Sequence, residues 1–204
     1  MLRILPTFHA DVFYKSNIGT EEQRQSMIDQ ALAERSKNDK TLAWTNRGCW
    51  RSYFLYNNID WLMEEVRDSV RQAGFHYQEQ DPIYKKKAAS FTGSEIKYWT
   101  NINRTGGKNA THDHRLWHYV AVYYLQAEGT GDLTFYNPIN LTESCNPYAP
   151  FVSPISLSPK NGDLVVWPAW LPHEVEHNFS DKERINVAMN IRFKAPMSLE
   201  DVEY

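Results

Sequence analysis

The stretch THDHRLWHYVAVYYL, residues 111–125, places two histidines just before an apolar run with the texture of a β-strand. His112 and His114 are two positions apart, and residues at i and i+2 of a strand project from the same face. Two imidazoles on one face repel each other when protonated and are costly to bury without partners. A shared metal ion removes both problems, because imidazole is a good ligand for iron, zinc, copper and nickel. We therefore predict a metal site here.

A third histidine lies far along the chain, in NGDLVVWPAWLPHEVEHN. His173 opens a separate predicted strand, residues 173–177, and is expected to complete the metal site. A slip of one residue in strand register would instead turn Asp113 toward this face, so Asp113 is the alternative local ligand. The remaining histidines are expected to be ordinary core or surface residues: His9, His76, His118 and His177.

The segment RINVAMNIRF, residues 184–193, alternates polar and apolar residues as a strand does. One face carries Arg184, Asn186, Ala188 and Asn190, and the other carries Ile185, Val187 and Met189. A face that is polar and partly small suits a wet cavity better than a packed interior. Because a guanidinium presents a two-pronged donor that matches a carboxylate, Arg184 indicates a binding place for a small dicarboxylate beside the metal.

Short strand-like runs dominate the chain from residue 87 onward. Turn signals such as TGGKN, EGTGD and PKNGD separate them. The predicted strands cover 95–103, 117–126, 132–136, 152–157, 163–167, 173–177 and 184–194. Consecutive strands without intervening helical patterns indicate a mainly β fold, either a sandwich or a rolled-up double sheet.

The first 86 residues read as a strand within 1–15 and two supporting helices. Thr20 and Gln23 form a capping box at the start of the first helix. The second is predicted to start near Asn58 and to end at Gly74, where a left-handed residue would belong. Residues 41–57 read as irregular. Each helix has one apolar stripe, so we expect both to brace the sheet within a single α+β domain, residues 1–204.

Composition excludes several classes of function. The chain has 204 residues and a net charge of −3, so a basic surface for nucleic acid is not expected. It has no apolar run of about 20 residues to span a bilayer and no pattern of a secretory signal. Cys49 and Cys145 are two distant cysteines, expected to be reduced thiols. We therefore expect a cytoplasmic protein.

Taken together, His-x-His, the VYYL strand, the Gly-Asp-Leu turn, Pro-His-Glu-Val and an arginine eleven residues further resemble the 2-oxoglutarate and Fe(II)-dependent oxygenases. Within that superfamily, the chain is most similar to the uncharacterised 2OG-Fe(II) oxygenases related to prolyl 4-hydroxylases. WTNINRTGGKNATHDH, residues 99–114, and GDLVVWPAWLPHEVEHNFSDKERINVAMN, residues 162–190, carry most of the resemblance.

The resemblance implies a double-stranded β-helix, which is a jelly-roll or cupin-like barrel. It implies that the enzyme uses Fe(II), 2-oxoglutarate and O2, with ascorbate as a candidate reductant, and hydroxylates a C–H bond with release of succinate and CO2. By position, His112, His114 and His173 would hold the iron, Arg184 and Tyr124 would bind the distal carboxylate of 2-oxoglutarate, and Asn103, Asn186 and Asn190 would line the cavity. His114 departs from the usual set of two histidines and one carboxylate.

Two other functions stay open at this point. A cupin-like dioxygenase also uses three histidines but no keto acid, and it has no need of Arg184 and Tyr124 as a dicarboxylate anchor. A non-catalytic jelly-roll binding module would hold a structural metal or none, although structural zinc sites prefer four protein ligands. The segment 137–150 is a candidate lid over the pocket. The pattern selects neither a substrate nor an oligomeric state.

Overall fold

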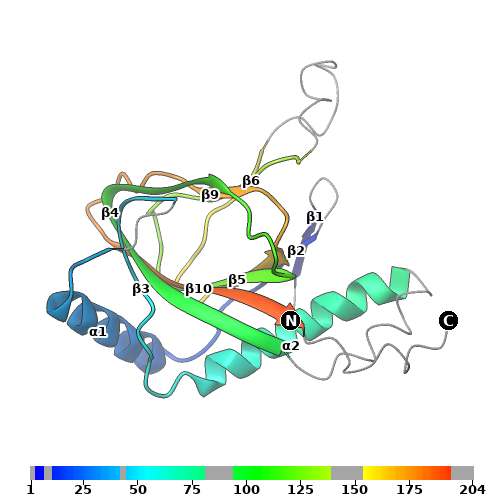
Figure 1. The fold of residues 1–204 in the computed structure, drawn as a ribbon, viewed down its shortest axis with the longest axis horizontal. Helices are drawn as coiled ribbons and strands as arrows, with labels where there is room; N and C mark the ends of the chain where they lie inside the picture. Colours follow the sequence, from blue (N-terminus) through cyan, green and yellow to red (C-terminus); the bar gives the residue numbers. More distant parts are fainter. Residues whose placement is uncertain (1–2, 7–10, 42–44, 81–93, 139–153, 194–204) are drawn as a thin grey trace, which may run out of the picture.

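The computed structural model describes residues 3–6, 11–41, 45–80, 94–138 and 154–193 (Figure 1). Their strands form one antiparallel ten-stranded sheet in the order β1-β2-β8-β5-β10-β4-β9-β6-β7, and β3 also pairs with β4. The strands are β1 (Arg3–Pro6), β2 (Asp11–Lys15), β3 (Asn46–Ser52), β4 (Ser94–His112), β5 (Tyr119–Gln126), β6 (Leu133–Phe135), β7 (Ile155–Leu157), β8 (Leu164–Pro168), β9 (His173–Val175) and β10 (Arg184–Phe193). The helices are α1 (Glu21–Lys37) and α2 (Asp60–Gln80).

The long strand β4 curls the sheet. Its first part pairs with β10, from Ser94 to Asn103, and its end pairs with β9, from Asn109 to His112. The register with β9 shifts between these last two residues, and irregular pairing of this kind bends a strand. Figure 1 shows β4 passing from the layer that holds β10 to the layer that holds β9 and β6. The sheet is therefore rolled into a half-barrel, which confirms the predicted mainly β, jelly-roll fold class.

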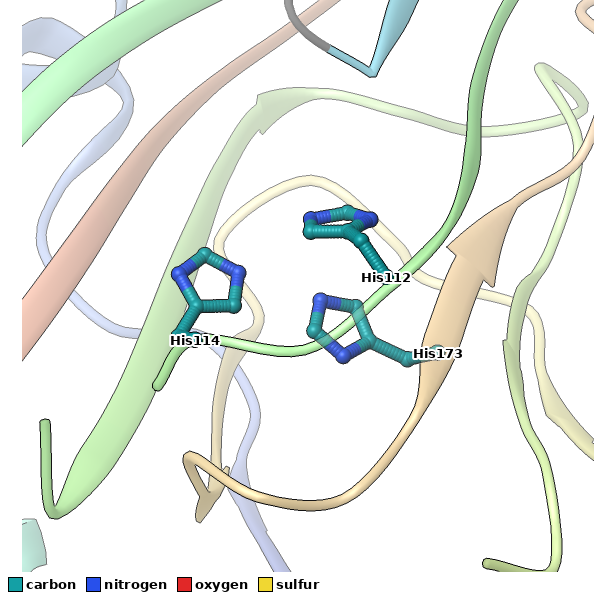
Figure 2. A group of neighbouring side chains, drawn as sticks. All are labelled: His112, His114 and His173. Carbon is teal, nitrogen blue, oxygen red and sulfur yellow. The ribbon is translucent and has the colours of Figure 1, made fainter. Parts of the chain in front are cut away.

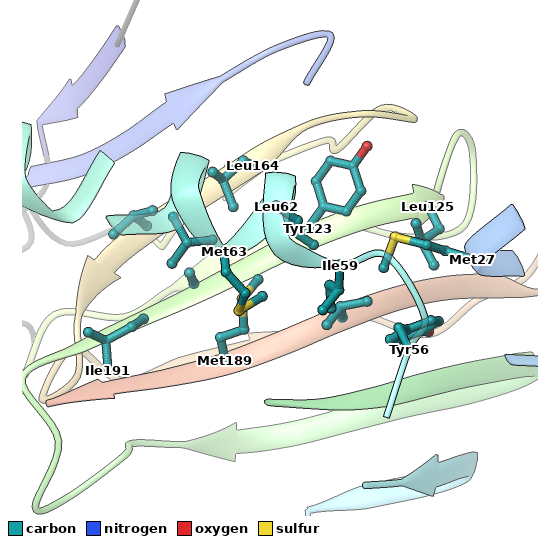
Figure 3. Close-up of a cluster of buried hydrophobic side chains, with 14 of the residues drawn as sticks. Met27, Tyr56, Ile59, Leu62, Met63, Tyr123, Leu125, Leu164, Met189 and Ile191 are labelled. Carbon is teal, nitrogen blue, oxygen red and sulfur yellow. The ribbon is translucent and has the colours of Figure 1, made fainter. Parts of the chain in front are cut away.

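Strand β10 separates two apolar clusters because its residues alternate between the two faces. Ile185, Val187 and Met189 face a cluster that also contains residues of both helices. Ala188 belongs to the second cluster, inside the curl, with Trp99 and residues of β5 and β8. Figure 3 shows α2 lying over the first cluster. The helices thus cover the outer face of the sheet, as predicted.

The start of α1 matches the sequence prediction, whereas the end of α2 does not. The capping box is present: Gln23 donates its backbone N–H to Thr20 Oγ1 at 3.2 Å, and Thr20 donates to Gln23 Oε1 at 2.8 Å. The predicted end at Gly74 is wrong, because α2 continues to Gln80. His76 Nε2 lies 2.8 Å from Asp11 Oδ2, so a contact with β2 holds the helix beyond the glycine.

Two strand predictions also need correction. The strand expected within 1–15 is two paired strands, β1 and β2. Residues 41–57, predicted to be irregular, contain β3. Gly48 has φ of +64°, and the register between β3 and β4 shifts between Arg47 and Cys49. This irregularity breaks the period-2 pattern by which a strand is recognised.

Some expectations fall outside the described residues. These are the boundary between the supporting part and the barrel at 86/87, nearly all of the candidate lid at 137–150, and Cys145. Within the described part, Cys49 is a buried free thiol. No helix there is long and apolar enough to cross a membrane.

Candidate metal centre

Three imidazole rings lie close together in the wall of one cavity. One ligand atom each from His112, His114 and His173 forms a group in which all atoms lie within 4.8 Å of one another. The ring centroids are 5.0 Å apart for His112 and His114, 4.4 Å for His112 and His173, and 5.1 Å for His114 and His173. Figure 2 shows the three rings converging from two segments distant in sequence. This spacing suits three ligands of one metal ion.

The two neighbouring histidines are positioned differently. His112 ends β4 and is the register partner of His173 on β9. His114 lies beyond the end of β4, where its backbone N–H donates to the carbonyl of Ala169 at 2.8 Å. The prediction that both rings come from one strand is therefore wrong for His114, because the chain leaves the sheet after His112. A loop contact, not strand alternation, brings the second ring to the site.

Hydrogen bonds leave one nitrogen of each ring available to a metal. His112 Nδ1 donates to the carbonyl of Ala110 at 2.7 Å, and His173 Nδ1 donates to that of Leu171 at 2.9 Å. A carbonyl only accepts, so each Nδ1 carries the proton and each Nε2 carries the lone pair. His114 Nε2 is buried and has no partner among the described residues. These three atoms are a donor set that fits a metal ion.

The surroundings keep the rings neutral. Burial lowers the pKa of His173 well below its usual value, and the two neighbouring imidazoles lower it further. Burial, then His112, lowers the pKa of His114 to about 4. Burial also lowers the pKa of His112. Asp113 does not join the group, and its Oδ1 lies 3.3 Å from Arg115 Nε. The three histidines thus offer neutral ligands at physiological pH.

A cavity of about 490 Å³ opens beside the rings, within the range of small-molecule sites. Besides the three histidines, the predicted site residues Tyr124, Asn186 and Asn190 line it. The other two predicted residues, Asn103 and Arg184, are fully buried and lie outside its lining. The Tyr124 hydroxyl has no hydrogen bond to the described residues, and burial raises its pKa, so it stays a proton donor.

Arg184 makes mostly backbone contacts. Its Nη1 donates to the carbonyls of Thr130 at 2.8 Å and Gly131 at 3.0 Å, and its Nη2 donates to that of Glu176 at 3.1 Å. The expectation that its side chain lies in a wet cavity is therefore wrong for these donors. Its Nε is buried without a partner among the described residues. This N–H remains available to a ligand that reaches behind the cavity wall.

The sequence did not indicate that buried amides form a hydrogen-bonded row along the cavity wall. Asn103 Nδ2 donates to Asn109 Oδ1 at 2.9 Å, and Asn109 Nδ2 donates to Asn46 Oδ1. Asn46 Nδ2 donates to Asn101 Oδ1 at 3.5 Å, and Asn101 Nδ2 donates to Asn186 Oδ1 at 3.0 Å. We call these five residues the amide chain. One end, Asn103 Oδ1, is buried without a partner in the described part, and the other four asparagines line the cavity.

A second missed residue is Arg51 on β3, which lines the cavity. The asparagines of the amide chain had a sequence signal, because Asn101, Asn103 and Asn109 lie at even spacing and so share one face of β4. Arg51 had none, since its strand was not recognised.

Comparisons with known proteins agree with this arrangement. Residues 97–190 match the family described as "Putative 2OG-Fe(II) oxygenase". A prolyl-4-hydroxylase from Pseudomonas putida has a similar structure, with a TM-score of 0.62 and 15% identity over 90% of this chain and 93% of that chain. The sequence matches no curated protein.

Two further solved structures share the fold. One is a prolyl hydroxylase from Trichoplax adhaerens in complex with a peptide fragment of the hypoxia inducible factor oxygen degradation domain. Its TM-score is 0.62, with 13% identity over 89% of this chain and 83% of that chain. The other is SnoK, a non-heme alpha ketoglutarate dependent carbocyclase from nogalamycin biosynthesis, with a TM-score of 0.61 and 9% identity over 93% of this chain and 83% of that chain.

Proposed function

Since residues 97–190 match the 2OG-Fe(II) oxygenase family, we propose that the chain is a 2-oxoglutarate- and Fe(II)-dependent dioxygenase that hydroxylates a C–H bond of its substrate. Succinate and CO2 would be the by-products. The observation that carries the proposal is the convergence of His112, His114 and His173, each with a ring nitrogen free to bind a metal. Two of the similar structures are named prolyl hydroxylases, which supports hydroxylation as the outcome.

The three histidines would hold Fe(II) through their Nε2 atoms. The backbone carbonyls of Ala110 and Leu171 fix two of the ring orientations, and such outer contacts also raise the basicity of the ligands. Bound Fe(II) with 2-oxoglutarate supplies the activation of O2, coupled to loss of CO2 from the keto acid. Trp167 lies 4.8 Å from the His173 ring, centroid to centroid, and excludes water from that side.

The buried end of the cavity would bind the distal carboxylate of 2-oxoglutarate. Within the described residues the Tyr124 hydroxyl and the Arg184 Nε–H have no hydrogen-bond partner, so both have a donor to offer. Asn186 on β10 is the register partner of Tyr124 on β5 and lines the same cavity. Asn103 lies opposite Arg184 in the register of β10 and β4, and its buried Oδ1 lacks a partner in the described part. Unpaired buried donors are costly, and the carboxylate would relieve that cost at Tyr124 and Arg184, whereas the Asn103 oxygen needs a donor that a carboxylate does not supply.

Replacing the usual carboxylate by His114 changes the charge of the site. Three neutral ligands leave the full charge of the metal to be balanced by the bound keto acid. This favours retention of an anionic co-substrate. The donors of Tyr124 and Arg184 that lack partners within the described residues also favour the keto-acid enzyme, because a cupin-like three-histidine dioxygenase needs no dicarboxylate anchor.

The test is formation of succinate from 2-oxoglutarate by the protein supplied with Fe(II), ascorbate and O2. We expect slow succinate production even without added substrate, and none from His173→Ala. His118 is the matched control, because its Nδ1 accepts a hydrogen bond from the backbone N–H of Phe193 and the residue lies outside the histidine group. His118→Ala should therefore behave as the parent protein. Consumption of O2 without formation of succinate would favour the cupin-like alternative. If neither O2 consumption nor succinate formation is observed, the binding module is favoured.

Compartment and partners follow from the same proposal. The co-substrates are 2-oxoglutarate and O2. The buried free thiol of Cys49 and the net charge of −3 support a cytoplasmic enzyme that does not act on nucleic acid.

A further inference from the structure

Arg51 forms part of the cavity wall on the side of β3. Its Cζ lies 4.4 Å from the centroid of the Trp99 ring and 5.2 Å from that of Tyr53, and its Nη2 donates to the Tyr53 hydroxyl at 2.7 Å. The Trp99 ring in turn stacks on His114, with centroids 6.0 Å apart and an interplanar angle of 17°. Trp99 thus lies between a fixed guanidinium and one of the three metal-binding histidines.

This guanidinium has no acidic partner in the part of the chain that the structure describes. The two other cations that line the cavity do: Arg115 Nε lies 3.3 Å from Asp113, and Lys97 Nζ lies 3.5 Å from Glu95. Arg51 Nε is also buried without a hydrogen bond. Burial lowers the pKa of Arg51, which reflects the loss of its water. A cation in this position is costly unless an anion pairs with it.

Arg51 is also separate from the residues proposed for 2-oxoglutarate. It is the register partner of Asn101, which pairs with Asn186, which pairs with Tyr124. Two strands therefore lie between Arg51 and Tyr124, a backbone separation of roughly 14 Å at the usual spacing of strands. One anion bound to Tyr124 would leave the charge of Arg51 unbalanced. A second anionic group is needed.

We propose that Arg51 binds the carboxylate of the substrate, and that the substrate is a small carboxylic acid whose carbon skeleton lies against Trp99. A carboxylate fits better than a phosphate, because a single unpaired cation matches a single negative charge and the planar guanidinium matches a planar anion. This substrate class rests on the proposed function, since the site becomes a substrate site only when the histidines hold a metal.

Two compounds of the same shape test the charge requirement: 4-fluorobenzoate and 4-fluorobenzamide. The protein is loaded with Mn(II), which serves as a paramagnetic probe in the histidine site, and with 2-oxoglutarate. Fluorine relaxation then reports how much of each compound lies near the metal. The variant is Arg51→Gln, and the matched control is Arg115→Gln, because Arg115 also lines the cavity but is exposed and paired.

We expect saturable relaxation of the benzoate in the parent protein and in Arg115→Gln, and affinity lower by roughly ten- to a hundredfold in Arg51→Gln. The benzamide should bind as weakly as the benzoate binds to Arg51→Gln. Equal binding of both compounds, no binding of either, or benzoate binding that survives Arg51→Gln would overturn the inference. Mn(II) and 2-oxoglutarate binding are measured on the same samples. If they fail, the proposed function fails as well, and if they persist unchanged, only the role of Arg51 is lost.

Discussion

His112 and His173 are register partners on the antiparallel strands β4 and β9, and their ring centroids lie 4.4 Å apart. Register partners of an antiparallel pair project to the same face of the sheet, so backbone pairing alone brings these side chains together. Each ring also donates its Nδ1–H to the carbonyl two residues before it. Two of the three proposed metal ligands are therefore fixed by the sheet itself.

Removing either partner should weaken metal binding strongly. His112→Ala and His173→Ala are each expected to lower the affinity for Mn(II) or Fe(II) by roughly a hundredfold or more, because two ligands remain. His114→Asp should keep metal binding, since it restores two histidines and one carboxylate. Titration calorimetry with Mn(II) measures the three variants, with His118→Ala as control. Parent-like affinity in His173→Ala would contradict the proposed ligand set.

The metal-free protein should lose stability as the pH falls below about 6.5. The folded state lowers the pKa of the site histidines, to about 4 for His114, so the unfolded chain binds more protons between these values. Unfolding is then favoured by acid, by up to about 1.4 kcal/mol per pH unit for each histidine. Urea unfolding between pH 7.5 and pH 5 measures this slope. His114→Gln should make it shallower, and an unchanged slope would argue against a depressed pKa.

Breaking the amide chain should destabilise the fold more than removing an isolated amide. Asn101 both accepts from Asn46 and donates to Asn186, so Asn101→Ala leaves two buried groups without partners. We expect a loss of about 1–3 kcal/mol in the free energy of unfolding. Asn190→Ala is the control, because Asn190 lies outside the amide chain and loses at most a contact with the His114 ring, so the cost should be smaller. Denaturant titration compares them, and equal losses would remove the chain's structural role.

Tyr124→Phe should weaken the binding of 2-oxoglutarate while leaving the stability of the protein unchanged. The hydroxyl makes no hydrogen bond to the described residues, so its loss costs the fold little. Its loss should raise the KM for 2-oxoglutarate by roughly tenfold, the worth of one hydrogen bond to a charged group. Succinate production at varied 2-oxoglutarate measures this change. A fall in the thermal midpoint without a change in KM would mean that Tyr124 acts only in packing.

Arg184 should serve both the fold and the co-substrate. Its Nη donors bind the carbonyls of Thr130, Gly131 and Glu176, whereas its Nε remains unpaired within the described residues. Arg184→Lys cannot make all of these bonds with one ammonium group, so we expect both a lower thermal midpoint and a higher KM for 2-oxoglutarate. Calorimetric scans and succinate kinetics on the same sample separate the two effects. A shift in stability alone would assign Arg184 to the fold only.

The sequence was informative where one strand pattern carried the whole signal. β10 follows the predicted 184–194 almost to the residue, because its two faces differ sharply in polarity. His112 and His114 were singled out by their i, i+2 spacing, although only His112 lies in a strand. His114 reached the site by a loop contact with Ala169 that no periodicity encodes. Arg51 and Asn46 lie on β3, whose bulge at Gly48 hides the strand, so their place at the cavity required the folded chain.

In the proposed enzyme, three imidazoles bind one Fe(II) ion together with 2-oxoglutarate. The most direct measurement adds Fe(II) and then 2-oxoglutarate to the metal-free protein without oxygen, and records the visible absorption of the iron–keto-acid complex. We expect a new charge-transfer band that saturates at one Fe(II) per chain, is lost in His173→Ala and is retained in His118→Ala. A band absent from the parent protein, or present unchanged in His173→Ala, would contradict it.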